Sequence, residues 1–265
     1  MSATVGIRLL PMWRVVVVTL FVLLAAGSAW AGAWYAKLPS TADARARTEA
    51  LLRARGGTWA AIPPRSPLAR SVVAVEDERF FQHGAVDPIA LGRALVHVAT
   101  RASGDAGGST ITQQLAKNLY DDPVRPDALR DVAIAFKLQS RWSRPEILDL
   151  YLNAVSFGTG TVGAEAASLR LFHRPASRLD WAQATLLAGV PQAPSALDPT
   201  RHPAAAAARQ RQVIAALRDD GVISAAQAAA IERSAPGLLA SVSAPSRPAR
   251  ASRRTPSRPP ARPRT

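Results

Sequence analysis

Residues 107–118, GGSTITQQLAKN, contain a helix start that can be recognised from the sequence alone. The two glycines allow a tight turn, and Thr110 and Gln113 have the spacing of a capping box, in which both side chains bond free amides of a new helix. The hydroxyls of Ser109 and Thr110 at this helix N-terminus form a candidate anion site, and Lys117 lies on the same helix. Spacing alone supports equally well a capped surface helix with an incidental lysine.

The sequence around this stretch, from residue 67 to about residue 235, is helical in pattern. Several expected helix starts carry side chains that accept hydrogen bonds from free backbone amides: Asp87 before Pro88, Ser143 with Glu146, and Ser224 with Gln227. No run alternates apolar and polar residues for long enough to indicate a sheet, and no internal repeat is present. We therefore expect a mainly α domain, with bounds at residues 59–235.

Upstream, residues 75–87, VEDERFFQHGAVD, place two carboxylates at the edge of a predicted core helix. Glu76 and Asp77 follow an apolar run, and a carboxylate held there is suited to act as a general base. A solvated acidic helix end is the simpler interpretation of an isolated Glu-Asp pair. The functional interpretation gains from the residues that come next and would close such a site: Phe80, Phe81 and His83.

Downstream, residues 146–167, EILDLYLNAVSFGTGTVGAEAA, combine an apolar helix face with a glycine-rich loop. Ile147, Leu150, Tyr151 and Phe157 supply the apolar face. We interpret most of this segment as structural.

The N-terminal part contains an almost uncharged run at residues 15–36, which has the length of a helix that crosses a bilayer. Arg8 and Arg14 precede it, so the positive-inside rule places residues 1–14 in the cytoplasm. A cleaved signal peptide is the alternative, because Ala29-Trp30-Ala31 resembles a cleavage site. In either case the chain after Lys37 lies outside the cytoplasm. Residues 37–58 are expected to be a linker with one short helix at about residues 42–55.

The net charge of +14 suggests a polyanionic partner, of which nucleic acid is the most common kind. Half of this charge, however, lies in residues 241–265, which contain seven arginines and no acidic residue. Their Arg/Pro/Ser composition cannot bury a core, so a disordered tail is expected. Outside the cytoplasm no nucleic acid is accessible. Anionic lipids or acidic wall polymers remain candidate partners, beside the alternative of a solvated tail without a partner. The chain has no cysteine.

Together these motifs resemble the peptidoglycan glycosyltransferase family, which includes monofunctional biosynthetic peptidoglycan transglycosylases and the glycosyltransferase modules of penicillin-binding proteins. The family pattern E-D-x-x-F-x-x-H-x-G-x-D is similar to residues 76–87, and G-G-S-T-I-T-Q-Q-x-x-K-N is matched throughout residues 107–118. EILDLYLN and residues 186–199, LLAGVPQAPSALDP, resemble two further family segments. The resemblance covers about residues 59–230.

The resemblance implies a lysozyme-like, two-lobed fold behind one transmembrane helix, with the smaller lobe facing the membrane. It implies a reaction in which lipid II is polymerised into β-1,4-linked glycan and undecaprenyl diphosphate is released. Glu76 would be the base for the acceptor hydroxyl, Asp131 a second catalytic carboxylate, and Lys117 and Arg125 the holders of the diphosphate. The other residues carried over as substrate-binding are Asp77, Phe80, His83, Ser109, Thr110, Gln113, Gln114, Asn118 and Arg130.

The resemblance also implies a setting: the inner membrane of a bacterial cell, with the catalytic domain periplasmic. Lipid II, the growing strand and the membrane are the expected partners, and a transpeptidase or divisome or elongation proteins are further candidates. No metal ligands are assigned, and a need for a divalent cation, Mg²⁺ or Mn²⁺, is left open. A bifunctional synthase is excluded because no S-x-x-K or K-T-G transpeptidase motif is found.

The sequence departs from the family at two places. The third motif, R-K-x-x-E, falls on residues 127–131, where the Arg-Lys pair is missing and Asp131 replaces the glutamate. Arg130 is expected to replace part of the lost positive charge. Ala85 stands where a glycine is usual, and alanine tolerates a positive φ poorly. These departures leave open a catalytically weakened paralogue that binds lipid II or scaffolds a synthase, and a lysozyme-like hydrolase is a third alternative.

Overall fold

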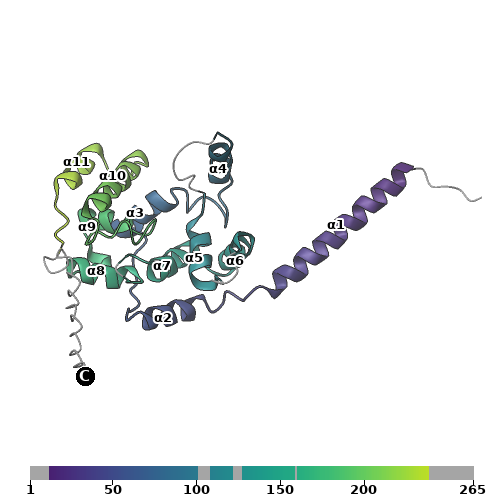
Figure 1. The fold of residues 1–265 in the computed structure, drawn as a ribbon, viewed down its shortest axis with the longest axis horizontal. Coiled ribbons are helices and arrows are strands. Elements are labelled where there is room, and N and C mark those ends of the chain that lie inside the picture. Colours follow the sequence, from purple (N-terminus) through teal and green to yellow (C-terminus); the bar gives the residue numbers. More distant parts are fainter. Residues whose placement is uncertain (1–11, 101–107, 122–126, 159, 239–265) are drawn as a thin grey trace, which may run out of the picture.

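The computed structural model describes residues 12–100, 108–121, 127–158 and 160–238. Over these residues the chain is helical, without a regular strand, so the predicted mainly α class is confirmed (Figure 1). The elements are α1 (Met12–Lys37), α2 (Ala44–Ala54), α3 (Pro67–Glu76), α4 (Pro88–Thr100), α5 (Ile111–Tyr120), α6 (Ala128–Arg141), α7 (Arg144–Ala154), α8 (Ala164–Phe172), the 3₁₀ turn η1 (Ala176–Arg178), α9 (Trp181–Ala188), α10 (Pro203–Asp219) and α11 (Ala225–Arg233).

The predicted helix starts are confirmed by their hydrogen bonds. Capping boxes open α5 at Thr110, α7 at Ser143 and α11 at Ser224. Asp87 accepts the backbone N–H of Ile89 at 2.9 Å, which caps α4. These local bonds satisfy amides that have no partner within the helix, so each start is determined by neighbouring residues.

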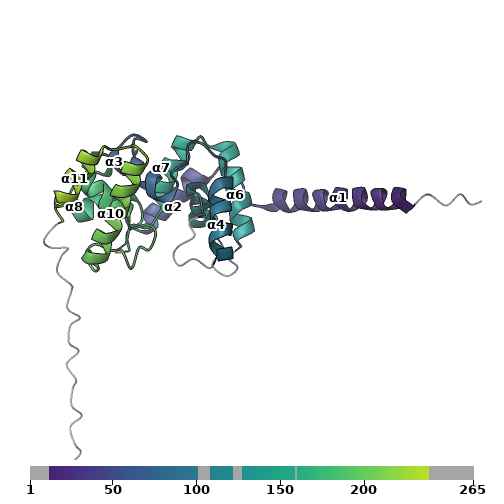
Figure 2. The ribbon, with the colours of Figure 1, turned by 90° about the horizontal axis from the view of Figure 1, so that it is seen from above.

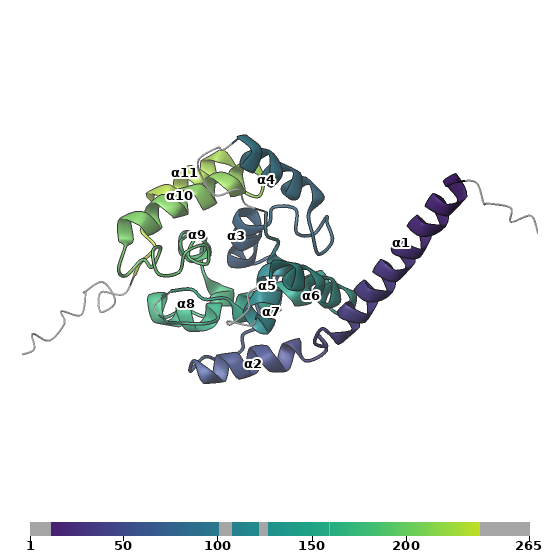
Figure 3. The same cartoon turned by 45° about the vertical axis from the view of Figure 1, so that its right-hand side comes forward.

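The packed helices form two groups around α7. α3 packs against α9 and α10, and α11 packs on α10; on the other side α5 packs against α6 and α7 (Figure 3). The apolar face predicted in residues 146–167 lies in the core, because Ile147, Leu150, Tyr151 and Phe157 are all buried. These four residues belong to the hydrophobic core cluster, and burial of this face stabilises the position of α7 in the domain.

The apolar N-terminal run is the long helix α1, which projects away from the packed body (Figure 2). It has the length and composition of a membrane-crossing helix, as a signal sequence can also have. Its end is fastened to α6: Lys137 Nζ donates to the carbonyl of Leu38 at 2.7 Å and lies 4.8 Å from the ring centre of Tyr35.

The expected linker at residues 37–58 is partly wrong, because its helical piece packs onto the body. α2 buries Ala44, Thr48 and Leu52 and lies against α7. Leu52 in turn approaches the position where a Cβ on Gly163 would stand, at 2.8 Å, so the glycine makes room for it. An amphipathic helix with a buried apolar stripe is part of the domain rather than a tether.

Four sequence predictions lie wholly or partly outside the described residues: residues 1–11 of the cytoplasmic N-terminus, the disordered tail at residues 241–265, the diphosphate role of Arg125, and the first glycine of residues 107–118.

Candidate active site

A cavity of about 650 Å³ lies between the C-terminal end of α3, the helices α5 and α6, and two loops. It brings together residues that are far apart in sequence, from Glu76 to Pro194. Its lining residues are Glu76, Ser109, Gln113, Gln114, Lys117, Asn118, Ala128, Asp131, Val132, Val155, Ser156, Pro191, Gln192 and Pro194. Seven of the residues predicted from the sequence therefore meet in this one space: Glu76, Ser109, Gln113, Gln114, Lys117, Asn118 and Asp131.

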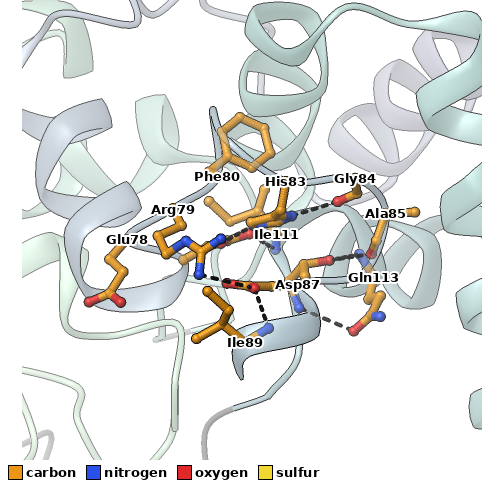
Figure 4. A network of polar contacts seen from close by, with 12 residues as sticks. Glu78, Arg79, Phe80, His83, Gly84, Ala85, Asp87, Ile89, Ile111 and Gln113 are labelled. Carbon is orange, nitrogen blue, oxygen red and sulfur yellow. Dashed lines mark hydrogen bonds and ion pairs between the residues drawn. The ribbon is translucent and has the colours of Figure 1, made fainter. Parts of the chain in front are cut away.

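The position of α5 is set by hydrogen bonds to residues 75–87. Asp77 accepts the backbone N–H of Ile111 at 3.0 Å with one oxygen and lies 2.6 Å from His83 Nε2 with the other. Thr110 donates its hydroxyl to the carbonyl of Ala85 at 2.9 Å. Figure 4 shows the surrounding network with His83, Ala85 and Ile111. Burial raises the pKa of Asp77, and the hydrogen bonds from His83 and Ile111 oppose that rise. The two motifs form one hydrogen-bonded unit.

Phe80 and His83 lie behind the cavity rather than in its lining. Both are buried, and Arg144 donates to the backbone carbonyls of both residues. Asp77 and Thr110 line a smaller neighbouring cavity of about 170 Å³. The predicted substrate-binding residues Asp77, Phe80 and His83 therefore shape the frame that presents Glu76.

Glu76 sits at the end of α3, and side chains from α5 and α10 approach its carboxylate. Gln114 on α5 donates its side-chain amide to Glu76 Oε2 at 2.9 Å, and Tyr151 on α7 donates its hydroxyl to Gln114 Oε1 at 2.8 Å. Arg209 on α10 brings a guanidinium nitrogen to 3.9 Å from Glu76 Oε1. The Glu76 carboxylate is thus held in one orientation at the edge of the cavity.

Lys117 and Asp131 line another part of the same cavity. Burial raises the pKa of Asp131, as does the charge of Asp121, while the charges of Lys117 and Arg130 lower it. Arg130 Nη1 donates to the backbone carbonyl of Tyr120 at 2.6 Å. Arg130 therefore supports this wall from behind, where its charge still reaches Asp131.

Ala85, which stands where the family usually has a glycine, does not have the positive φ that would strain an alanine. Among the described non-glycine residues only His173 has a positive φ, so Ala85 is not in the left-handed region. Ala85 is fully buried, with its carbonyl bound by Thr110. Its methyl group fits here without the strain that a positive φ would impose.

Several residues that meet the site are not among those predicted from the sequence to act there: Tyr151, for which a structural role is expected, Arg209, Ser156 and Gln192. No local pattern singles out Arg209, which is one of thirty arginines. Its side chain packs over Gly189, where a Cβ would stand 2.7 Å from Arg209 Cγ. The described residues include no group of three or more His, Asp or Glu side chains that could hold a metal ion.

Comparison with known proteins identifies the family of the chain. The family model described as "Transglycosylase" matches residues 50–218. This chain therefore belongs to the transglycosylase family, which is the peptidoglycan glycosyltransferase family that its motifs resemble. The mainly α, lysozyme-like fold behind one apolar helix is the fold expected for that family.

Among curated relatives, Penicillin-binding protein 1F of Bacillus subtilis (strain 168) is 36% identical over 168 residues, which cover 63% of this chain and 24% of the relative. Penicillin-binding protein 1A of Escherichia coli (strain K12) is 33% identical over 168 residues, 63% of this chain and 20% of the relative. A crystal structure of Penicillin-Binding Protein 1A from Haemophilus influenzae matches with 26% identity and a TM-score of 0.35, over 37% of this chain and 15% of that one. The chain spans about a quarter or less of the length of these relatives.

Proposed function

We propose that this protein is a membrane-anchored peptidoglycan glycosyltransferase that polymerises lipid II into β-1,4-linked glycan and releases undecaprenyl diphosphate. The observation that carries the proposal is a single cavity lined by Glu76 from α3 and by Lys117 and Asp131 from α5 and α6. Transfer of a sugar from a diphosphate needs a base for the attacking hydroxyl. It also needs positive charge where the leaving group becomes negative.

In the proposed reaction Glu76 accepts the proton of the acceptor sugar hydroxyl while the hydroxyl oxygen attacks the anomeric carbon of the growing chain. The new carbon–oxygen bond forms with inversion. The bond from that carbon to the diphosphate breaks, and its electron pair leaves with undecaprenyl diphosphate. Lys117, together with Arg125, would neutralise the diphosphate, and Asp131 would act beside Lys117 as the second carboxylate.

The proposed binding roles fall into two groups. Ser109, Gln113 and Asn118 line the cavity and would contact the donor sugar and its phosphates. Thr110, Asp77, Phe80 and His83 would act indirectly, because they hold the start of α5 and the segment around Glu76 in place.

The proposed location is the outer face of a bacterial inner membrane, with residues 15–36 of α1 as a single span and the N-terminus in the cytoplasm. Arg8 and Arg14 flank the span on the cytoplasmic side by the positive-inside rule. Exposed apolar side chains on α4 and α6 supply a further contact with lipid: Ile89, Leu91, Val96, Leu129 and Phe136. A transpeptidase or divisome or elongation proteins would be the protein partners.

A second candidate function is a catalytically weakened paralogue that binds lipid II or scaffolds a synthase. The observation that favours it is the start of α6, where the family pattern has an Arg-Lys pair. Asp127 stands there and uses its carboxylate to accept the N–H groups of Leu129 and Arg130, at 3.0 and 3.2 Å. A helix cap at this position supplies no positive charge to a diphosphate.

The experiment that separates these functions is incorporation of labelled lipid II by the purified full-length protein in lipid vesicles. The proposed function predicts long glycan strands. Binding of lipid II without any product would favour the scaffold, and digestion of finished cell-wall glycan would favour a hydrolase. A parallel reaction with EDTA shows whether a divalent cation takes part.

A further inference from the structure

Tyr151 contributes a hydroxyl to a place where packing alone would need only a phenyl ring. The residue is fully buried on α7, among the core side chains. Its hydroxyl donates to Gln114 Oε1 at 2.8 Å, and Gln114 in turn donates to Glu76 Oε2 at 2.9 Å. Three helices, α7, α5 and α3, are therefore linked by a chain of two hydrogen bonds that ends on the carboxylate of Glu76.

The direction of this chain follows from the chemistry of its members. A side-chain amide has one accepting end and one donating end, and an ionised carboxylate only accepts. With the Tyr151 hydroxyl donating to the oxygen of Gln114, the NH₂ group of Gln114 is directed to Glu76. Protonated Glu76 would instead favour the opposite orientation of the amide, in which the Tyr151 hydroxyl would have to accept.

The Tyr151 hydroxyl, the first donor in this series of two hydrogen bonds, stays protonated. Burial raises the pKa of Tyr151 well above its ordinary value, and the charges of Glu76 and Asp77 raise it further. The hydroxyl therefore keeps its proton over the whole range in which an enzyme works, and it can always donate to Gln114.

We propose that Tyr151 is a positioning residue for the base: its hydroxyl sets the orientation of the Gln114 amide, which holds Glu76 Oε2 in the geometry that accepts the substrate proton. This inference rests on the proposed function, in which Glu76 is the base. It changes the role of Gln114 as well, from a contact for the donor sugar to a link within the protein.

Other charged groups also face Glu76 and enter any pH dependence. Asp77 adjoins it at the end of α3, and Arg209 reaches it from α10 at 3.9 Å. Lys117 and Asp131 share its cavity from α5 and α6. All four stay unchanged when only the Tyr151 hydroxyl is removed, so the variant isolates the contribution of the hydrogen-bonded chain.

The test is Tyr151→Phe, assayed for lipid II polymerisation across pH. We expect kcat to fall by roughly 5- to 30-fold, the equivalent of one or two hydrogen bonds, with KM for lipid II little changed. The acidic limb of the pH profile should move to higher pH, because the carboxylate loses support for its charged form. A residue that only fills the core would lower thermal stability and leave the pH profile in place.

Tyr120→Phe is the matched control. Tyr120 is also buried, and its hydroxyl also donates to an acceptor, Asp43, at 2.9 Å. That bond joins the last residue of α5 to the residue that precedes α2 and does not involve Glu76, so its loss should affect stability and leave kcat and the pH profile as in the wild type.

A double-mutant cycle completes the test. Once Gln114→Leu has broken the chain, adding Tyr151→Phe should cause no further loss of kcat. If Tyr151→Phe fails to fold, Gln114→Glu serves instead, and it should move the acidic limb to higher pH because a second carboxylate faces Glu76.

An unchanged kcat and pH profile in a folded Tyr151→Phe, additive losses in the cycle, or an unchanged profile in Gln114→Glu would each overturn the inference. Wild type and Glu76→Gln run in the same assay test the proposed function separately. If the wild type is active and Glu76→Gln is not, a negative result with Tyr151→Phe counts against the positioning role alone.

Discussion

Two walls of one cavity are built in different ways. The α5 wall, residues 109–118, is bonded at several points to the segment that carries Glu76, through Ile111, Thr110 and Gln114. In the α6 wall, residues 127–132, the side chain of Asp127 caps its own helix, and Asp131 Oδ1 is buried without a hydrogen-bond partner among the described residues. The α5 wall is therefore bonded to the segment that carries the base, whereas the side-chain bonds of Asp127 in the α6 wall stay within its own helix.

This difference follows the sequence. Residues 107–118 match the family pattern throughout, and residues 127–131 have lost its Arg-Lys pair and its glutamate. We expect substitutions at the base and at Lys117 in the α5 wall to lower polymerisation most, and substitutions in the α6 wall to have smaller effects on its rate or on the stability of the fold.

The largest effect is expected for Glu76→Gln. The change is nearly isosteric, so the fold should remain, while loss of a general base should lower polymerisation by about 10²- to 10⁴-fold. Glu78→Gln is the control, because Glu78 is exposed and pairs with Arg93 at 3.1 Å outside the main cavity. Glycan assays and melting curves measure both; normal polymerisation by folded Glu76→Gln would show that another group is the base.

Lys117→Met is expected to come next. It removes the described cation that lines the cavity, and loss of one such group costs about 10²- to 10³-fold in kcat. Lys137→Met is the control, because it removes the same charge outside the cavity, at the junction with α1, where Lys137 donates to the carbonyl of Leu38. Comparable kcat in the two variants would argue against a diphosphate site at Lys117.

Asp131→Glu tests whether the shorter side chain limits the rate. One added methylene extends the carboxylate towards the position that a glutamate occupies in the family, and we expect kcat to rise by roughly tenfold or less. Steady-state kinetics with lipid II measure it. An unchanged kcat would mean that Arg130 and the local backbone already compensate.

Asp131→Asn is expected to raise the thermal stability of the protein at neutral pH without changing its fold. The pKa of Asp131 is raised in the folded state, so the folded protein favours the protonated carboxyl. The contribution of Asp131 to the free energy of unfolding is therefore fully present below the unfolded pKa and is lost as pH rises through the folded pKa. The amide has no such ionisation, so at neutral pH the variant should melt higher than the wild type, and the difference should vanish in acid. Melting curves between acid and neutral pH decide; equal melting temperatures throughout would contradict the burial of this charge.

The predictions from sequence were confirmed where a structural feature is determined by residues close together in the chain. The capping box of Thr110 and Gln113 and the cap of Asp87 on α4 depend on residues a few positions apart. Five residues of the α5 wall line one cavity because they lie on or next to one short helix, and their roles toward a substrate stay a prediction: Ser109, Gln113, Gln114, Lys117 and Asn118.

The predictions failed where the cause lies in packing between distant segments. Arg209 reaches Glu76 because α10 packs on α3, and the space for its side chain comes from Gly189 on a third segment. The sequence does not show that the hydroxyl of Tyr151 has a role, because a tyrosine on an apolar helix face can be explained by packing of its ring alone. α2 is rich in arginine and alanine, which is typical of an exposed linker helix. Its packing on the domain depends on three buried residues, Ala44, Thr48 and Leu52.

The most direct test of the proposed chemistry is the release of undecaprenyl diphosphate from lipid II, followed together with glycan formation in one reaction of the purified full-length protein. We predict one diphosphate released for each glycosidic bond formed by the wild type, and neither product from Glu76→Gln. Bound lipid II with no release of diphosphate, or equal release by both proteins, would contradict a glycosyltransferase whose base is Glu76.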